Sequence, residues 1–73
     1  MIQQTDIQKE LKNAIKQSGL KQTEIAERLG IKQSQISCYV HGKKMPAMDT
    51  FANLCVILDV DPADILCTNK KIN

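Results

Sequence analysis

The sequence predicts a compact all-α domain built from five helices. Apolar residues recur every three or four positions along most of the chain, as they do on the buried face of a helix. The three glycines fall where these apolar stripes stop, at positions 19, 30 and 42. One run could form a short strand, residues 55–58, but it continues a helical stripe without an interrupting residue. We therefore expect helices and no sheet.

Caps and glycines delimit the first three helices. Thr5 is the expected N-cap of the first helix, with the Gln8 side chain reaching back to it as in a capping box. A second helix is expected from about Gln22 to Leu29 and a third from about Gln33 to Val40, each stopped by the next glycine. The residues expected to face the core are Ile7, Leu11, Ala14 and Ile15, then Ile25, Ala26 and Leu29, then Ile36, Tyr39 and Val40.

Proline and aspartate mark the last two helices. Pro46 predicts a loop, because the residue before a proline disfavours the helical conformation. A fourth helix is expected to begin at residues 47–49, and a fifth to open with Asp61 as N-cap and Pro62 in the first turn. The residues expected to face the core in this half are Met48, Phe51, Leu54, Cys55, Leu58, Ile65 and Leu66.

Length, composition and charge restrict the class of protein. The 73 residues allow one domain, residues 1–67, followed by a flexible tail at 68–73. A hydrophobic content of 42% excludes a disordered chain. No segment resembles a membrane span or a signal peptide, so we expect a cytoplasmic protein without membrane contact. Residues 1–44 carry eight Lys/Arg against four Asp/Glu, whereas residues 45–73 carry two against four, which suits a polyanionic partner on one side.

The residues that could support catalysis or metal binding are too few. Cys38, Cys55 and Cys67 are odd in number and widely spaced, so they form no disulfide framework. Cys38 and His41 could share a helix face as zinc ligands do, but no second pair completes a tetrahedral site. No nucleophile has a base and an acid nearby, and there is no Gly-rich phosphate loop. We expect no enzymatic activity, no metal and no cofactor.

Residues 22–41 place two short helices around the turn Gly30-Ile31-Lys32. This is the layout of a helix-turn-helix, whose second helix enters the major groove of DNA. The segment Gly19–Ile31, followed by Ile36-Ser37, Gly42-Lys43 and Pro46, resembles the Cro and Xre-type helix-turn-helix family typified by phage repressors. The resemblance covers roughly Ile7 to Leu66. It implies a five-helix DNA-binding domain that regulates transcription, usually as a dimer.

The outward face of the third helix is expected to contact bases. Helical geometry turns five of its residues away from the core: Gln33, Ser34, Ser37, Cys38 and His41. We expect base contacts from Gln33, Ser34, Ser37 and Cys38. Gln33 lies at the start of the helix, and its amide can bond both N6 and N7 of adenine. The family often has a basic residue where Cys38 stands, and a thiol at this position could instead act as a redox switch.

The helix ends are expected to hold phosphates. The residues concerned are Lys21, Gln22, Lys32, His41, Lys43 and Lys44. The resemblance implies that Gln22 bonds the DNA backbone, helped by the positive end of its helix. Lys21 and Lys32 stand at N-cap positions, where the family usually has Ser or Thr, although lysine cannot accept a capping hydrogen bond. Our hypothesis is that both lysines are tolerated there because they bind phosphate.

Two further expectations concern packing and assembly. Many family members have a buried Arg–Glu ion pair where Ile15 and Val40 stand, and we predict that these two aliphatic residues contact each other. A single domain must both read DNA and dimerise, and the dimer-interface candidates are Val56, Ile57 and Ile65. Two copies would read half-sites about 34 Å apart.

The sequence therefore predicts a sequence-specific regulator that binds double-stranded DNA as a homodimer. A phage repressor, a restriction–modification controller and an antitoxin all fit this size. The alternative is a protein-interaction module that keeps the fold but has little affinity for DNA, for example an antitoxin or antirepressor partner.

Overall fold

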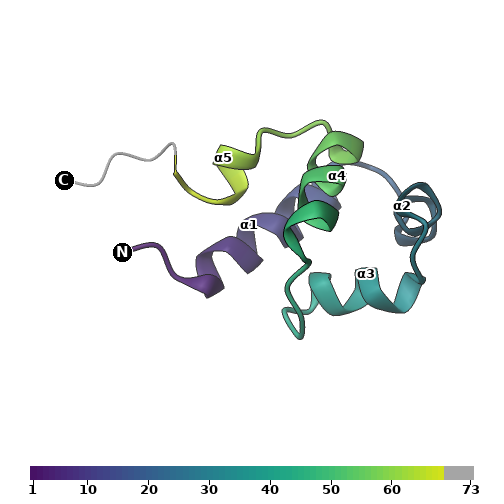
Figure 1. Cartoon of the computed structure of the whole chain (residues 1–73), viewed down its shortest axis with the longest axis horizontal. Helices are drawn as coiled ribbons and strands as arrows, with labels where there is room; N and C mark the ends of the chain where they lie inside the picture. The colour runs from purple at the N-terminus through teal and green to yellow at the C-terminus, as the bar shows by residue number, and fades with distance from the viewer. Residues whose placement is uncertain (69–73) are drawn as a thin grey trace.

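The computed structural model describes residues 1–68, and these residues form five helices without a strand (Figure 1). The helices are α1 (Gln4–Gln17), α2 (Gln22–Leu29), α3 (Gln33–Val40), α4 (Met48–Leu58) and α5 (Pro62–Ile65). The expected all-α class is confirmed, and α2 and α3 have the expected bounds. None of the helices within residues 1–68 is both long and apolar enough to cross a bilayer. The tail expected at 68–73 lies, apart from Thr68, outside the described residues.

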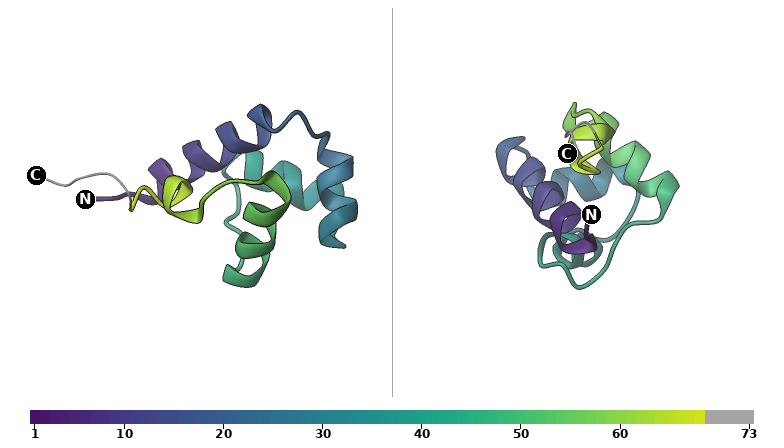
Figure 2. Two further views of the ribbon diagram at one scale, coloured as in Figure 1. Left: turned by 90° about the horizontal axis from the view of Figure 1, so that it is seen from above. Right: turned by 90° about the vertical axis from the view of Figure 1, so that its left-hand side faces the viewer.

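One apolar core joins all five helices. The recognition-helix candidate α3 packs against both α1 and α2, while α4 packs on α2 and α5 packs on α1 (Figures 1 and 2). Ile15 from α1 and Val40 from α3 are both buried members of this core, which keeps their predicted contact open to test. The buried cluster consists of Leu11, Ala14, Ile15, Ile25, Ala26, Ile36, Tyr39, Val40, Leu54, Cys55, Leu58 and Ile65.

The ends of α2 and α3 are closed in the same way. A left-handed glycine follows each helix, Gly30 with φ 72° and Gly42 with φ 71°. The next backbone N–H then donates to a carbonyl five residues back, Ile31 to Ala26 at 3.0 Å and Lys43 to Cys38 at 2.9 Å. At each helix end this hydrogen bond satisfies a carbonyl that has no partner within the helix. Together with the left-handed glycine it sets the direction in which the chain leaves the helix.

The capping box expected at Thr5 and Gln8 is wrong. The N-cap of α1 is Gln3, whose backbone N–H donates to Asp6 Oδ2 at 2.9 Å. A carboxylate near the positive end of a helix is a better acceptor than a neutral amide, which explains why Asp6 takes this place. Gln8 instead donates across the fold to the Gly42 carbonyl oxygen.

The last two helices begin where expected, but one of the core residues expected in them is exposed. Asp61 caps α5 as expected, since its Oδ1 accepts the Ala63 N–H at 2.9 Å. Met48 was expected in the core but is 87% exposed. It is the first residue of α4, and this end of α4 projects away from the other helices (Figure 2). The apolar face of α4 therefore reaches the core only from Phe51 onward, which is half-buried against it.

Candidate nucleic-acid interface

The two helices of the predicted unit are held at a fixed angle by small and branched apolar residues. Ile25 and Ala26 of α2 and Ile36 of α3 are buried, and α2 and α3 contact each other directly. Ala26 permits close approach because it has only a methyl group. The turn between them, Gly30 to Lys32, contains the hydrogen bond from the Ile31 N–H to the Ala26 carbonyl oxygen. The geometry is that of a helix-turn-helix.

The outer face of α3 is polar. Gln33 and Ser34 are exposed, whereas Ser37 and Cys38 are half-buried. Ser34 and Cys38 lie on the side of α3 that faces away from Ile36, Tyr39 and Val40, and Ser37 lies at the edge of that side. Gln33 lies in the row of Val40, seven residues on, and is exposed on the first turn of the helix. Gln35 is also exposed on the first turn, and sequence reasoning missed it. The signal was present, since Gln35 precedes the buried Ile36 and follows two outward residues.

A hollow of about 560 Å³ is lined by residues from the starts of both α2 and α3. Its lining combines the predicted phosphate-contact residues Lys21 and Gln22 with the predicted base-contact residue Gln33. Lys16 at the end of α1 and Thr23 on the first turn of α2 also line it, and sequence reasoning assigned neither to the site. The spacing of Lys9, Lys12 and Lys16 by three and four residues is the signal that could have identified a basic flank on α1.

Both helix starts in this region have open backbone amides. Lys21 and Lys32 occupy the N-cap positions of α2 and α3, and neither side chain makes a capping hydrogen bond. Both lysines are exposed. The first N–H groups of a helix have no partner within the helix and carry partial positive charge. Lysines beside such amides give a local environment that favours an anion.

The far end of α3 carries the remaining predicted phosphate contacts. His41, Lys43 and Lys44 are all exposed, and they follow one another around the left-handed Gly42. The expected basic residues therefore lie at both ends of α3, with the polar face between them.

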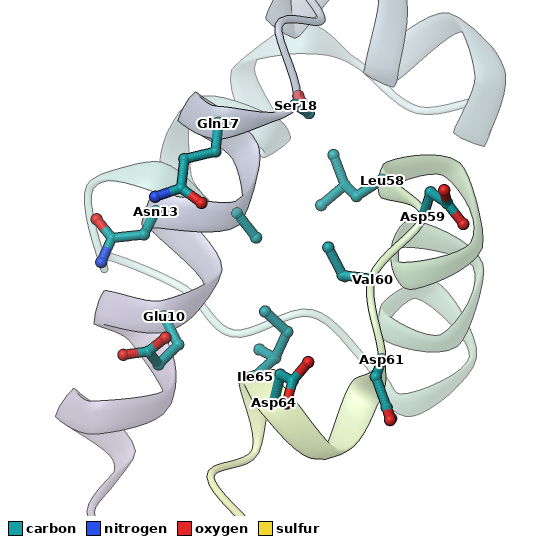
Figure 3. A pocket seen from close by; sticks show the side chains of 11 residues that line it. Glu10, Asn13, Gln17, Ser18, Leu58, Asp59, Val60, Asp61, Asp64 and Ile65 are labelled. Carbon is teal, nitrogen blue, oxygen red and sulfur yellow. The ribbon is translucent and has the colours of Figure 1, made fainter.

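Acidic residues gather on a different side of the molecule. A hollow of about 460 Å³ between α1 and the segment 58–65 is lined by Glu10, Asp59, Asp61 and Asp64 (Figure 3). Leu58 and Val60 point into it toward α1, whereas Asp59 and Asp61 point outward. The carboxylates thus do not converge on one point. Three of the four acids of residues 45–73 thus lie together, whereas Glu24 and Glu27 remain on α2, where Glu27 lines a separate hollow with Gln33.

The dimer-interface candidates differ in accessibility. Val56 is 78% exposed and Ile57 is half-buried, so both have surface to offer. Ile65 is only 3% exposed, and its selection as an interface residue is wrong. It lies in the core because the four-residue helix α5 packs this side chain inward onto α1.

The three cysteines are not joined in disulfide bonds. Cys38, Cys55 and Cys67 are free thiols, the last two buried. Within residues 1–68 no three His, Cys, Asp or Glu side chains are grouped so that they could hold a metal ion.

The fold and the polar face of α3 define the class of small helix-turn-helix proteins that bind DNA. A family model described as helix-turn-helix matches residues 11–65, which is more than half of the chain. No curated protein and no solved structure matches the chain. The chain belongs to the helix-turn-helix family, of the Cro/Xre type that its sequence resembles, and this membership supports a DNA-binding regulatory function.

Proposed function

We propose that the protein is a sequence-specific transcriptional regulator that binds duplex DNA as a homodimer, with α3 in the major groove. The observation that carries this proposal is the arrangement around α3. Its exposed polar face lies between a lysine-lined hollow at the starts of α2 and α3 and a second basic segment after α3. Such a layout lets phosphate contacts position the helix while its side chains read bases.

Base recognition is assigned to Gln33, Ser34, Ser37 and Cys38. Gln33 lies on the first turn of α3 and its exposed amide offers both a donor and an acceptor, which matches adenine. The two serines add adaptable hydrogen bonds, and half-buried Cys38 offers a small apolar contact. Exposed Gln35 joins this set as a fifth candidate.

Phosphate binding is assigned to two groups of residues. Lys21, Gln22 and Lys32 stand at the starts of α2 and α3, where open amides add to the attraction. His41, Lys43 and Lys44 stand beyond the end of α3. These groups flank the base-reading face, as the two sides of a groove require.

Dimerisation is assigned to α4. Val56 and Ile57 remain candidates, and exposed Met48 extends the apolar surface along the same helix. A regulator of this size needs two copies to read two half-sites, about 34 Å apart. A role on DNA would place the protein in the cytoplasm.

Selection of bound sequences from a random duplex pool tests the function. We expect enrichment of a palindromic site with an A·T pair at the position read by Gln33. Affinity for the selected duplex should fall steeply with salt, because several phosphate contacts release counterions. Absence of duplex binding even at low salt would contradict the proposal and favour a protein-interaction module. Binding without enrichment of any sequence would contradict the sequence-specific part.

A further inference from the structure

Gln8 connects α1 to the turn that follows the recognition helix. Its Nε2 donates a partly buried hydrogen bond of 3.0 Å to the Gly42 carbonyl oxygen, between residues 34 positions apart. The contact is close, since a Cβ added at Gly42 would lie 3.4 Å from Gln8 Oε1. Neither the capping of α1 nor the phosphate contacts proposed above account for this bond.

The peptide unit that accepts this bond is held from its other side by α3. The Lys43 N–H donates to the Cys38 carbonyl oxygen at 2.9 Å. The Gly42 carbonyl and the Lys43 N–H belong to one planar trans peptide, so the two bonds fix one plane between α1 and α3. Glycine has the least restricted backbone dihedrals, and this plane would otherwise turn easily about ψ of Gly42.

Lys43 and Lys44 are the first two residues beyond this plane, and both are exposed. We propose that Gln8 is a positioning residue for DNA binding, which holds the 42–43 peptide so that both lysines leave α3 in one direction toward the phosphates. This inference rests on the proposed function. A chain segment that is ordered before binding loses less entropy on binding, so Gln8 would raise affinity without contacting DNA.

Gln8→Met tests the hydrogen bond. Methionine keeps an unbranched stem and a similar helix propensity but has no N–H donor. Gln17→Met is the matched control, because Gln17 is exposed on the same helix and lines the acidic hollow instead. The probe is a fluorescently labelled duplex of mixed sequence, bound at low salt and followed by anisotropy. We expect Gln8→Met to weaken binding about three- to tenfold, and Gln17→Met by less than about twofold.

The same two variants in a Lys43→Ala/Lys44→Ala background separate positioning from a general structural effect. If Gln8 acts through the lysines, Gln8→Met changes binding by less than about twofold there, because coupled residues are not additive. An equal loss in both backgrounds would overturn the inference. Unchanged binding of Gln8→Met in the wild-type background would overturn it as well.

Backbone relaxation measured by NMR gives a readout without DNA. The order parameters of Lys43 and Lys44 should fall in Gln8→Met and stay unchanged in Gln17→Met. Unchanged values in both variants would contradict the positioning role even if binding fell. A wild-type protein that binds no duplex at low salt would refute the proposed function, while the relaxation data would still decide whether Gln8 orders this turn.

Discussion

Lys32 stands at the N-cap of the recognition helix, where its side chain makes no capping hydrogen bond and its charge opposes the helix dipole. We predict that Lys32→Ser stabilises the fold by about 1 kcal/mol, because serine accepts a hydrogen bond from an open amide. The same change should weaken duplex binding and reduce the salt slope by about one counterion. Thermal melting and anisotropy at several salt concentrations measure the two effects.

Lys32→Met is the control for this prediction. Methionine removes the charge but cannot accept a capping hydrogen bond. Lys32→Met should therefore lose as much DNA affinity as Lys32→Ser, but without the stability that the capping hydrogen bond of serine adds. If Lys32→Ser left both the affinity and its salt slope unchanged, Lys32 would not be a phosphate contact.

Cys55 links a single residue to the pH dependence of stability. Burial raises the pKa of its thiol above the ordinary 9.0, and the Asp61 carboxylate raises that pKa further. As the pH rises, the unfolded state therefore loses the Cys55 thiol proton at a lower pH than the folded state does. The stability contribution is therefore complete below about pH 9 and is lost as the pH rises toward the raised value.

Cys55→Ala isolates this effect. Urea unfolding under reducing conditions should show a free-energy difference between wild type and Cys55→Ala that is constant from about pH 7 to 8.5 and shrinks above about pH 9. Other titrating groups contribute equally to both proteins and cancel in the difference. A difference that stayed constant up to about pH 10.5 would show that the thiol pKa is not raised.

At the scale of elements, α2 and α3 could be predicted because each apolar stripe stops at a glycine. Gly30 and Gly42 both adopt the left-handed conformation that ends a helix, and the intervals between glycines fixed the helix bounds. The core residues of α2 and α3 followed from the same periodicity. The exposure of Ser34 then follows from which residues face inward.

Other contacts left no pattern in the sequence. The Gln8 bond ends on a backbone carbonyl, and every residue has one, so no residue type identifies its partner. The sequence offered Ile65 both for the core and for the dimer interface, because the four residues of α5 are too few to show which way this side chain faces. The start of α1 depended on which side chain accepts the N–H of the N-cap residue, and the carboxylate of Asp6 takes this place instead of the amide of Gln8.

The contact between α1 and α3 is a second element-scale test. Ile15 and Val40 are both buried in the core, and we predict that they touch. Ile15→Arg alone should destabilise the fold by about 3–5 kcal/mol, because it buries an unpaired charge. Adding Val40→Glu should restore much of the loss if the two side chains meet. A double variant as unstable as the sum of both single variants would show that they do not.

At the scale of the whole molecule, three groups of side chains occupy different places. Lys21, Lys32, Lys43 and Lys44 lie around the ends of α3, four carboxylates line the hollow between α1 and the segment 58–65, and the exposed side chains of Met48 and Val56 lie on α4. A basic DNA-facing side keeps the attraction for phosphate from being cancelled by the four acids of the second half. The surface left for a second copy is then the apolar row on α4.

That row is built from Met48, Ala52 and Val56, which are exposed and spaced four residues apart on one face of α4. Ala52 at its centre lets a second helix approach closely, with larger side chains on either side. We predict that Val56→Glu weakens dimerisation at least tenfold, since a charge would be buried in an isologous contact twice. Asn53→Glu, exposed beside the row, is the control and should dimerise normally.

Sedimentation at several protein concentrations measures how tightly the protein dimerises. Binding to duplexes with one or two half-sites measures how dimerisation affects DNA binding. Val56→Glu should bind a single half-site like wild type, because α3 is untouched, and should lose cooperative binding to two half-sites. A variant that dimerised like wild type would place the interface elsewhere. A wild-type protein that stayed monomeric on DNA carrying two half-sites would refute the homodimer itself.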